Sequence, residues 1–422
     1  MRRDILLTVG ARVLIVTAGL LSSVITARVL GPKGRGEYFF LVTLSAAIVQ
    51  FGALGLHASN TYLVAKDRAR LPALTANSLL VALAVGGIGG TLVALLLPRL
   101  GFFPDTPDRF FWYAAALTPP TLFFLLGSNL LVGMGRIATF NFVDVASRAI
   151  VLLALVVAGV FALDVDGFAA ASILAWTAAA LMLGAMLRSG LGDLRFDRES
   201  FRSGFRFAAK TYAVAILGFA VLRGSVFLLQ HYYGSVELGY YSIATQIADV
   251  LALFPTSVAL VLFPALVRDR AGSWRTTRRS FVTVVATLIA AAAAAWVLAE
   301  PFIRVVYGAE FTPAAAVLRW QLPGVVAIGA TAVVSQYLAA HGLPRTLIGA
   351  WVAGLVALVV LGFTLVPDHA GSGAAAALSA SYVLVLCLVL LLAWRVRRGE
   401  GAQSEAGPSE PLAGRSESST LL

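Results

Sequence analysis

Long apolar runs constrain this chain more than any other feature of its sequence. Each run continues for about twenty residues, the length that an α-helix needs to cross a bilayer. Hydrophobic residues make up 59% of the 422 residues and charged residues only 13%, against about 25% charged in soluble proteins. The sequence therefore predicts an all-α polytopic membrane protein and excludes a soluble enzyme. We place twelve spans at 5–29, 38–64, 74–98, 110–133, 143–163, 168–187, 208–231, 238–265, 280–299, 312–337, 345–366 and 371–394.

The distribution of basic residues predicts the orientation. Twelve spans put both termini on one side of the membrane. With the N-terminus inside, about four Lys or Arg residues lie at the inner side for each one at the outer side, as cytoplasmic loops require. We therefore expect a multi-pass protein of the cell (inner or plasma) membrane with both termini in the cytoplasm. The same bias accounts for the net charge of +11, so nucleic acid is not an expected partner.

The chain is predicted to consist of two bundles and two cytoplasmic segments. The outer loops are short and leave no room for an extracytoplasmic catalytic domain, so we expect no enzyme activity. A single cysteine, Cys387, and scattered histidines give no metal site, and no cofactor is expected. The expected divisions are an N-terminal six-helix bundle at 1–187, a linker at 188–207, a C-terminal six-helix bundle at 208–394 and a disordered tail at 395–422.

A weak internal repeat relates the two bundles. At an offset of 203 residues, Gly31, Gly36 and Tyr38 match Gly234, Gly239 and Tyr241. An even number of spans in each repeat gives two parallel halves. We expect them to be related by a pseudo-two-fold axis along the membrane normal.

Four arginines lie within the predicted spans, where a charge costs free energy unless it faces a cavity or a partner. Arg223 is about 12 Å from the nearer helix end at 1.5 Å per residue, which favours a cavity. For Arg12 a cavity and the interface are equally favoured. Arg28 and Arg319 are nearer a helix end, where the side chain can reach the interface. All four are candidate cavity residues.

Polar residues share one face of the eighth predicted span. Gln246 and Asp249 are three residues apart, and the repeat maps Thr43 and Ala46 onto them. Gln50 follows Thr43 by two helical turns. Either these residues hold helices together or they line a central cavity, and the coincidence of the two faces favours the cavity.

Five short motifs follow one another along the chain: LGPKGRGEY at 30–38, GYYSIA at 239–244, LFP at 262–264, YGAEF at 307–311 and GSGAA at 371–375. Together they resemble those of the polysaccharide biosynthesis (Wzx-type) oligosaccharide flippases, within the multidrug/oligosaccharidyl-lipid/polysaccharide exporter superfamily. The resemblance extends over nearly all of 1–394. One departure is Ser225, where the family often has an acidic residue two positions after the arginine of the seventh span.

The resemblance implies a V-shaped pair of bundles that move a polyprenyl-diphosphate-linked oligosaccharide from the inner to the outer leaflet by alternating access. It implies a lipid-linked glycan and membrane lipid as partners, and it leaves a coupling cation and polysaccharide assembly proteins open. Two alternatives remain at this point: a cation-coupled multidrug antiporter and a membrane-embedded glycan polymerase or ligase. The first would favour an acidic, aromatic cavity, and the second a large outer loop.

Overall fold

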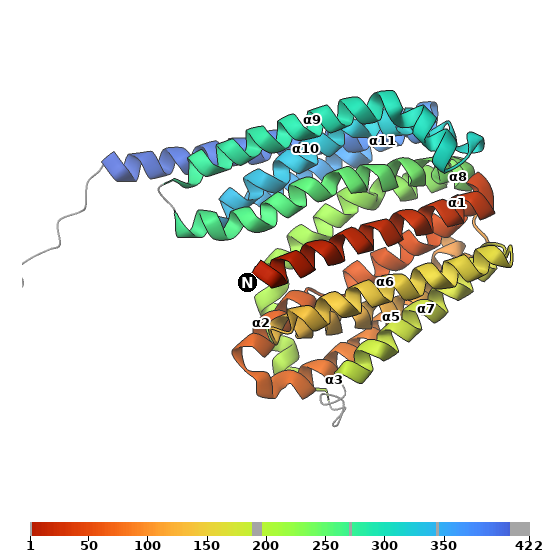
Figure 1. Ribbon diagram of the computed structural model, residues 1–422, viewed down its shortest axis with the longest axis horizontal. Coiled ribbons are helices and arrows are strands. Elements are labelled where there is room, and N and C mark those ends of the chain that lie inside the picture. Colours follow the sequence, from red (N-terminus) through yellow and green to blue (C-terminus); the bar gives the residue numbers. More distant parts are fainter. Residues whose placement is uncertain (1, 188–195, 270–271, 343–345, 406–422) are drawn as a thin grey trace, which may run out of the picture.

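The protein is helical throughout the residues that the computed structural model describes, which are 2–187, 196–269, 272–342 and 346–405 (Figure 1). No strand occurs among them. The fold class is thus confirmed. In chain order, the helices are α1 (Arg2–Gly52), α2 (Leu56–Lys66), η1 (Arg68–Arg70), α3 (Leu71–Val81), η2 (Ala82–Ile88), α4 (Gly89–Leu96), η3 (Pro98–Leu100), α5 (Asp108–Gly133), α6 (Ile137–Val160), α7 (Val165–Met186), α8 (Arg198–Arg268), α9 (Ser273–Val306), η5 (Ala309–Phe311), α10 (Ala314–Ala340) and α11 (Thr346–Glu405).

Three of these helices fold back on themselves. The backbone has φ of 66° at Gly31 in α1, 66° at Gly234 in α8 and 47° at Ala370 in α11. Figure 1 shows all three turns at one end of the molecule, far from the N-terminus. We call it the reversal end. Nine helices among the described residues are long and apolar enough to span a membrane, and these turns fall between predicted spans. The count of twelve crossings remains a prediction, which the turns support.

Two predicted spans are interrupted. The span predicted at 38–64 breaks after Gly52, because the chain turns through positive φ at Leu54 and Gly55 before α2 begins. The span predicted at 74–98 contains the π-helix η2 between α3 and α4. Glycines allow this segment to approach α5 closely. A Cβ at Gly86 would lie 3.3 Å from Pro119, and one at Gly90 would lie 3.0 Å from Ala115.

The helices of the second half extend beyond their predicted limits. α8 begins at Arg198, inside the predicted linker, because Asp197 caps its first turn by accepting hydrogen bonds from Glu199 and Ser200. The hydrogen bond from the Ser200 hydroxyl is the main cause that lowers the pKa of Asp197. α11 continues to Glu405, beyond the predicted start of the tail at 395. The rest of the predicted linker at 188–195 and of the tail at 406–422 lies outside the described residues.

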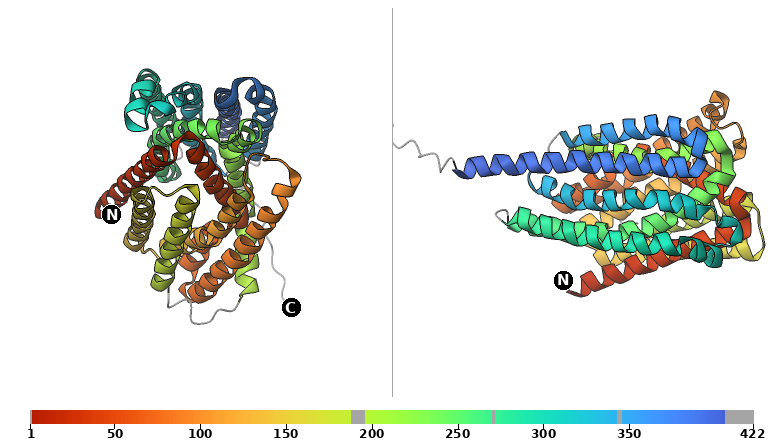
Figure 2. Two further views of the ribbon diagram at one scale, coloured as in Figure 1. Left: turned by 90° about the vertical axis from the view of Figure 1, so that its right-hand side faces the viewer. Right: turned by 90° about the horizontal axis from the view of Figure 1, so that it is seen from above.

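Hydrophobic cores form on both sides of α1 and α8. Figure 2 shows α9, α10 and α11 on one side and α5, α6 and α7 on the other. One core cluster is built from residues of α8 to α11, including Leu266 and Tyr337. Another is built from residues of α2, α3 and α5 to α7, including Leu130 and Leu183. A third cluster contains residues from both sides, so the two groups of helices share buried contacts.

Equivalent residues of the two sequence repeats contact each other, backbone to backbone, at the reversal end. A Cβ on Gly36 would overlap the carbonyl oxygen of Ser235, and a Cβ on Gly239 would overlap the carbonyl oxygen of Pro32. Gly36 and Gly239 are related by the sequence offset of 203, as are Pro32 and Ser235. The contact is therefore what a two-fold related pair of surfaces makes, each surface meeting its own repeat.

Candidate functional site

An ion pair between two membrane-embedded residues forms the centre of the candidate site. Nη2 of Arg223 lies 3.0 Å from Oδ2 of Asp249, and the two residues occupy opposite arms of α8. Their side chains are 22% and 42% exposed, so the pair is neither fully buried nor fully in solvent. Ser225, which replaces the acidic residue expected from the resemblance, donates a hydrogen bond to the carbonyl oxygen of Ala374. Asp249 therefore supplies the counter-ion from elsewhere on α8.

The second terminal nitrogen of Arg223 is unsatisfied within the described residues. Nη1 is buried and has no hydrogen-bond partner within the described residues. Tyr241 and Tyr382 lie close enough to Arg223 to interact with its charge. Nearby, the side-chain amide of Gln321 donates to the hydroxyl of Thr245 at 3.1 Å. A guanidinium with an unsatisfied nitrogen can donate a charge-assisted hydrogen bond to an anionic group that reaches it.

The other predicted cavity residues do not all gather at this pair. Gln246 is half-buried on the same arm as Asp249, and Thr43 is buried in α1. The backbone carbonyl of Gln50 accepts a hydrogen bond from the Tyr212 hydroxyl at 3.2 Å. Arg12 is exposed. The cavity role of these residues remains a proposal.

Arg28 and Arg319 both donate to backbone carbonyls of α9. Nε of Arg28 lies 3.0 Å from the carbonyl oxygen of Val306, at the C-terminal end of that helix. Nε of Arg319 lies 3.3 Å from the carbonyl oxygen of Trp296. The C-terminal end of a helix attracts positive charge, so the contact of Arg28 has a structural explanation of its own. Its membership of the cavity, and that of Arg319, also remains a proposal.

Sequence reasoning missed the most deeply buried arginine. Arg35 is 5% exposed and donates from its three nitrogens to the hydroxyls of Ser242 at 3.1 Å, Thr26 at 2.7 Å and Ser23 at 3.3 Å. All three acceptors are neutral hydroxyl groups. Arg35 lies between the spans predicted at 5–29 and 38–64, so the sequence placed it in a loop. The Ser242 contact joins residues 207 positions apart, and no local pattern could have revealed it.

Several further hydrogen bonds join the two sides of the molecule at the reversal end. The side-chain amide of Gln230 donates to the hydroxyl of Thr106 at 2.9 Å, and the ring of His231 is hydrogen-bonded to the carbonyl oxygen of Phe102 at 2.6 Å. With Arg28, Arg35 and the glycine contact, these interactions close the reversal end. Within the described residues, no group of three or more His, Cys, Asp or Glu side chains could hold a metal ion.

The fold is one that solved structures of membrane transporters share. A solved structure of the lipid II flippase MurJ in an inward closed conformation superposes with a TM-score of 0.72, at 14% identity, over 96% of this chain and 94% of that one. An inward-facing multidrug resistance MATE family transporter of the MOP superfamily also gives a TM-score of 0.72, at 14% identity, over 93% of this chain and 96% of that one.

The family follows from the sequence comparison. The profile of the family described as polysaccharide biosynthesis protein matches residues 1–269, and the chain belongs to this family. A curated relative, the lipid III flippase of Escherichia coli (strain K12), is 31% identical over 176 residues, which is 40% of this chain and 42% of that protein. The match to this relative thus spans less than half of its length.

Proposed function

We propose that this protein is a flippase that moves a polyprenyl-diphosphate-linked oligosaccharide from the inner to the outer leaflet. The observation that carries the proposal is the partly exposed Arg223, which is paired with Asp249 and leaves Nη1 without a hydrogen-bond partner among the described residues. Membership of the polysaccharide biosynthesis family and the resemblance to a lipid III flippase support it. The protein acts as a transporter and not as an enzyme.

The head group of the substrate would bind at the ion pair. A diphosphate presents several anionic oxygens, and a guanidinium can hold two of them through parallel charge-assisted hydrogen bonds. Binding would release Nη2 from Asp249, so that the guanidinium turns toward the head group. We extend the proposal to a coupling cation, which the released carboxylate would hold, and to polysaccharide assembly proteins that receive the exported glycan. Thr43, Gln50 and Gln246 would contact the sugars.

Alternating access would use the two repeats as moving bodies. We propose that 1–187 and 208–394 are the two domains, joined by the linker at 188–207. The contacts of Arg28 and Arg35 with the second repeat would close the outer side of the cavity while the substrate enters from the cytoplasmic leaflet. Opening to the outside would break those contacts. Both termini would lie in the cytoplasm throughout.

The test of this function is transport by the purified protein. Proteoliposomes would carry a fluorescent polyprenyl-diphosphate oligosaccharide in both leaflets, and an impermeant reductant would quench the outer leaflet. We expect quenching to proceed beyond the outer half only when the protein is present. A matched population of protein-free vesicles is the control. Quenching that stops at one half, or formation of longer glycans by the protein, would overturn the proposal.

The orientation has its own test. We expect a Gly192→Cys substitution, in the linker outside the described residues, to resist an impermeant thiol reagent on intact cells. Asp166→Cys, at the reversal end, should be labelled. Both are made in a Cys387→Ser background, because Cys387 is an exposed free thiol. Permeabilised cells serve as the control that the thiol of the Gly192→Cys variant can react. Labelling of this variant on intact cells would contradict the predicted orientation.

A further inference from the structure

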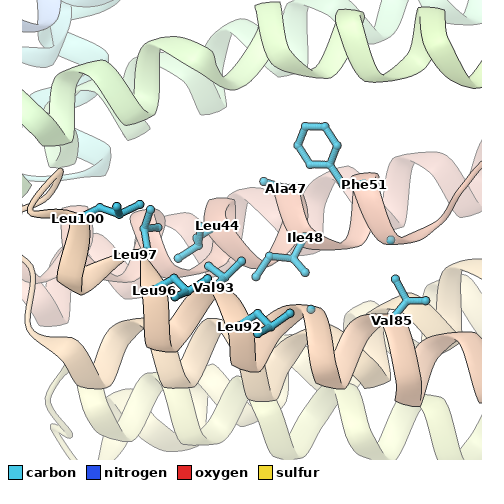
Figure 3. A pocket seen from close by; sticks show the side chains of 12 residues that line it. Leu44, Ala47, Ile48, Phe51, Val85, Leu92, Val93, Leu96, Leu97 and Leu100 are labelled. Carbon is cyan, nitrogen blue, oxygen red and sulfur yellow. The ribbon is translucent and has the colours of Figure 1, made fainter.

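An apolar groove lies between α1 and the segment that runs from η2 to η3. Its volume is about 480 Å³, within the range of about 300–1,000 Å³ typical of ligand pockets. We call it the α1–α4 groove. Figure 3 shows Leu44, Ile48, Leu92 and Leu96 directed into the space between the two helices. The groove is separate from the Arg223–Asp249 pair, which lies on α8.

Helical spacing explains why both walls are apolar. On one wall, Val85, Gly89, Leu92 and Leu96 follow one another at intervals of four, three and four residues, so they share one face. Leu44, Ile48 and Gly52 follow the same rule on α1. Gly89 has no side chain, and a Cβ there would meet no atom within 4 Å, which leaves room between the walls.

We propose that the α1–α4 groove holds the polyprenyl tail of the transported lipid while the head group is at Arg223. This inference rests on the proposed function and adds a second, apolar binding site to it. A lipid-linked glycan has two chemically opposite parts, and burying an apolar chain in an apolar groove is favourable. A membrane phospholipid would also fit the chemistry, and the experiment below distinguishes the two.

Three features favour the tail of the transported lipid over a membrane phospholipid as the occupant of the groove. First, the groove lies on the same arm of α1 as the candidate cavity residues Thr43 and Gln50. Second, Phe51 points away from α1 toward α8, which carries the ion pair (Figure 3). Third, the wall from Val85 to Leu100 is about 22 Å long at 1.5 Å per residue. This wall can therefore contact an extended lipid chain through most of a hydrocarbon core that is about 30 Å thick.

Two neighbouring glycines provide a matched pair of variants. A Cβ at Gly89 or at Gly87 meets no atom within 4 Å, so a larger side chain is accommodated at either position without overlap at its first carbon. Gly89 lines the groove, and Gly87 is not among its lining residues. Gly89→Phe should fill the groove, while Gly87→Phe adds the same side chain to the same segment outside it.

The direct measurement is photocrosslinking to the full-length protein in vesicles. The probe is a polyprenyl phosphate with a diazirine in its tail, and a phospholipid with a diazirine in one acyl chain is used in parallel. We expect the polyprenyl probe to label peptides around Leu44–Gly52 and Val85–Leu100. Gly89→Phe should reduce this labelling about tenfold, which corresponds to the loss of roughly two buried methylene groups. Gly87→Phe should not change it.

The outcomes separate the groove from the proposed function. The tail site is overturned if the polyprenyl probe labels the wild-type protein elsewhere in the chain. It is also overturned if the phospholipid probe labels the groove equally, even when transport is normal. Labelling that Gly89→Phe leaves unchanged also overturns it. If the Gly89→Phe variant does not fold, labelling of the groove in the wild-type protein by the polyprenyl probe is the result that supports the site. Failure of wild-type transport in proteoliposomes, with groove labelling intact, would instead overturn the flippase and leave a polyprenyl-binding site.

Discussion

Replacing Arg223 by alanine is expected to reduce translocation by about tenfold to a hundredfold, the loss that corresponds to removing a charged hydrogen bond worth about 1.5–3 kcal/mol. The protein should remain inserted and folded, because Asp249 is 42% exposed and can be hydrated. Arg223→Lys should recover only part of the activity, since a point charge lacks the planar fork that grips phosphate oxygens. Transport in proteoliposomes, normalised to folded protein, measures both effects.

Two controls make the Arg223 series specific. Arg304→Ala removes the same charge from an exposed position near the end of α9 and should transport as the wild type does. The double variant Arg223→Asp with Asp249→Arg keeps an ion pair but moves the positive charge to the other arm of α8. We expect its melting temperature to be near that of the wild type and its transport to stay low. Full transport by Arg223→Ala would show that this arginine does not bind the substrate.

A single methyl group at Gly36 should also impair transport, by about tenfold or more, because overpacking a tight contact costs about 1–3 kcal/mol. Its Cβ would overlap the carbonyl oxygen of Ser235, which is backbone and cannot rotate away. The reversal end could then close only with a backbone shift. We expect Gly36→Ala to lower the melting temperature as well as the transport rate in proteoliposomes.

The repeat supplies a second variant and the helices supply a control. Gly239→Ala places its Cβ against the carbonyl oxygen of Pro32 and should reproduce the Gly36→Ala defect. Gly349→Ala, in α11, adds the same methyl group where no atom lies within 4 Å, and it should be close to neutral. Normal transport and stability in both Gly36→Ala and Gly239→Ala would mean that this contact is not needed for closure.

Composition and local pattern were sufficient to predict the fold class and the reversals. The apolar runs require helices in a membrane, and Gly31 and Gly234 mark two of the turns because glycine adopts positive φ at little cost. The π-helix η2 was not predictable. Its register depends on how closely Gly86 and Gly90 approach α5, a tertiary contact that the hydrophobic pattern does not encode. The end of α11 was misplaced because polar composition predicted a tail where the helix continues.

The candidate site was predictable only where charge and periodicity coincide. Arg223 and Asp249 stood out because each is a charge within an apolar run, and the structure pairs them. The groove was not predicted, since apolar residues at helical spacing are expected on any lipid-facing helix. Arg35 was missed because one of its hydroxyl partners, Ser242, lies 207 residues away in the sequence.

The glycine contact has a mechanical consequence if the two repeats move as the rigid bodies proposed above. Two long bodies that touch backbone to backbone near one end would rotate about that contact as a pivot. α9 has 34 residues and is therefore about 51 Å long at 1.5 Å per residue. A rotation of about 10° about one end of such a body displaces the other end by roughly 9 Å, whereas the pivot hardly moves. The absence of side chains at Gly36 and Gly239 lets the two repeats come close enough to share that pivot. A small rotation at the reversal end would then produce a large displacement at the opposite end of the molecule.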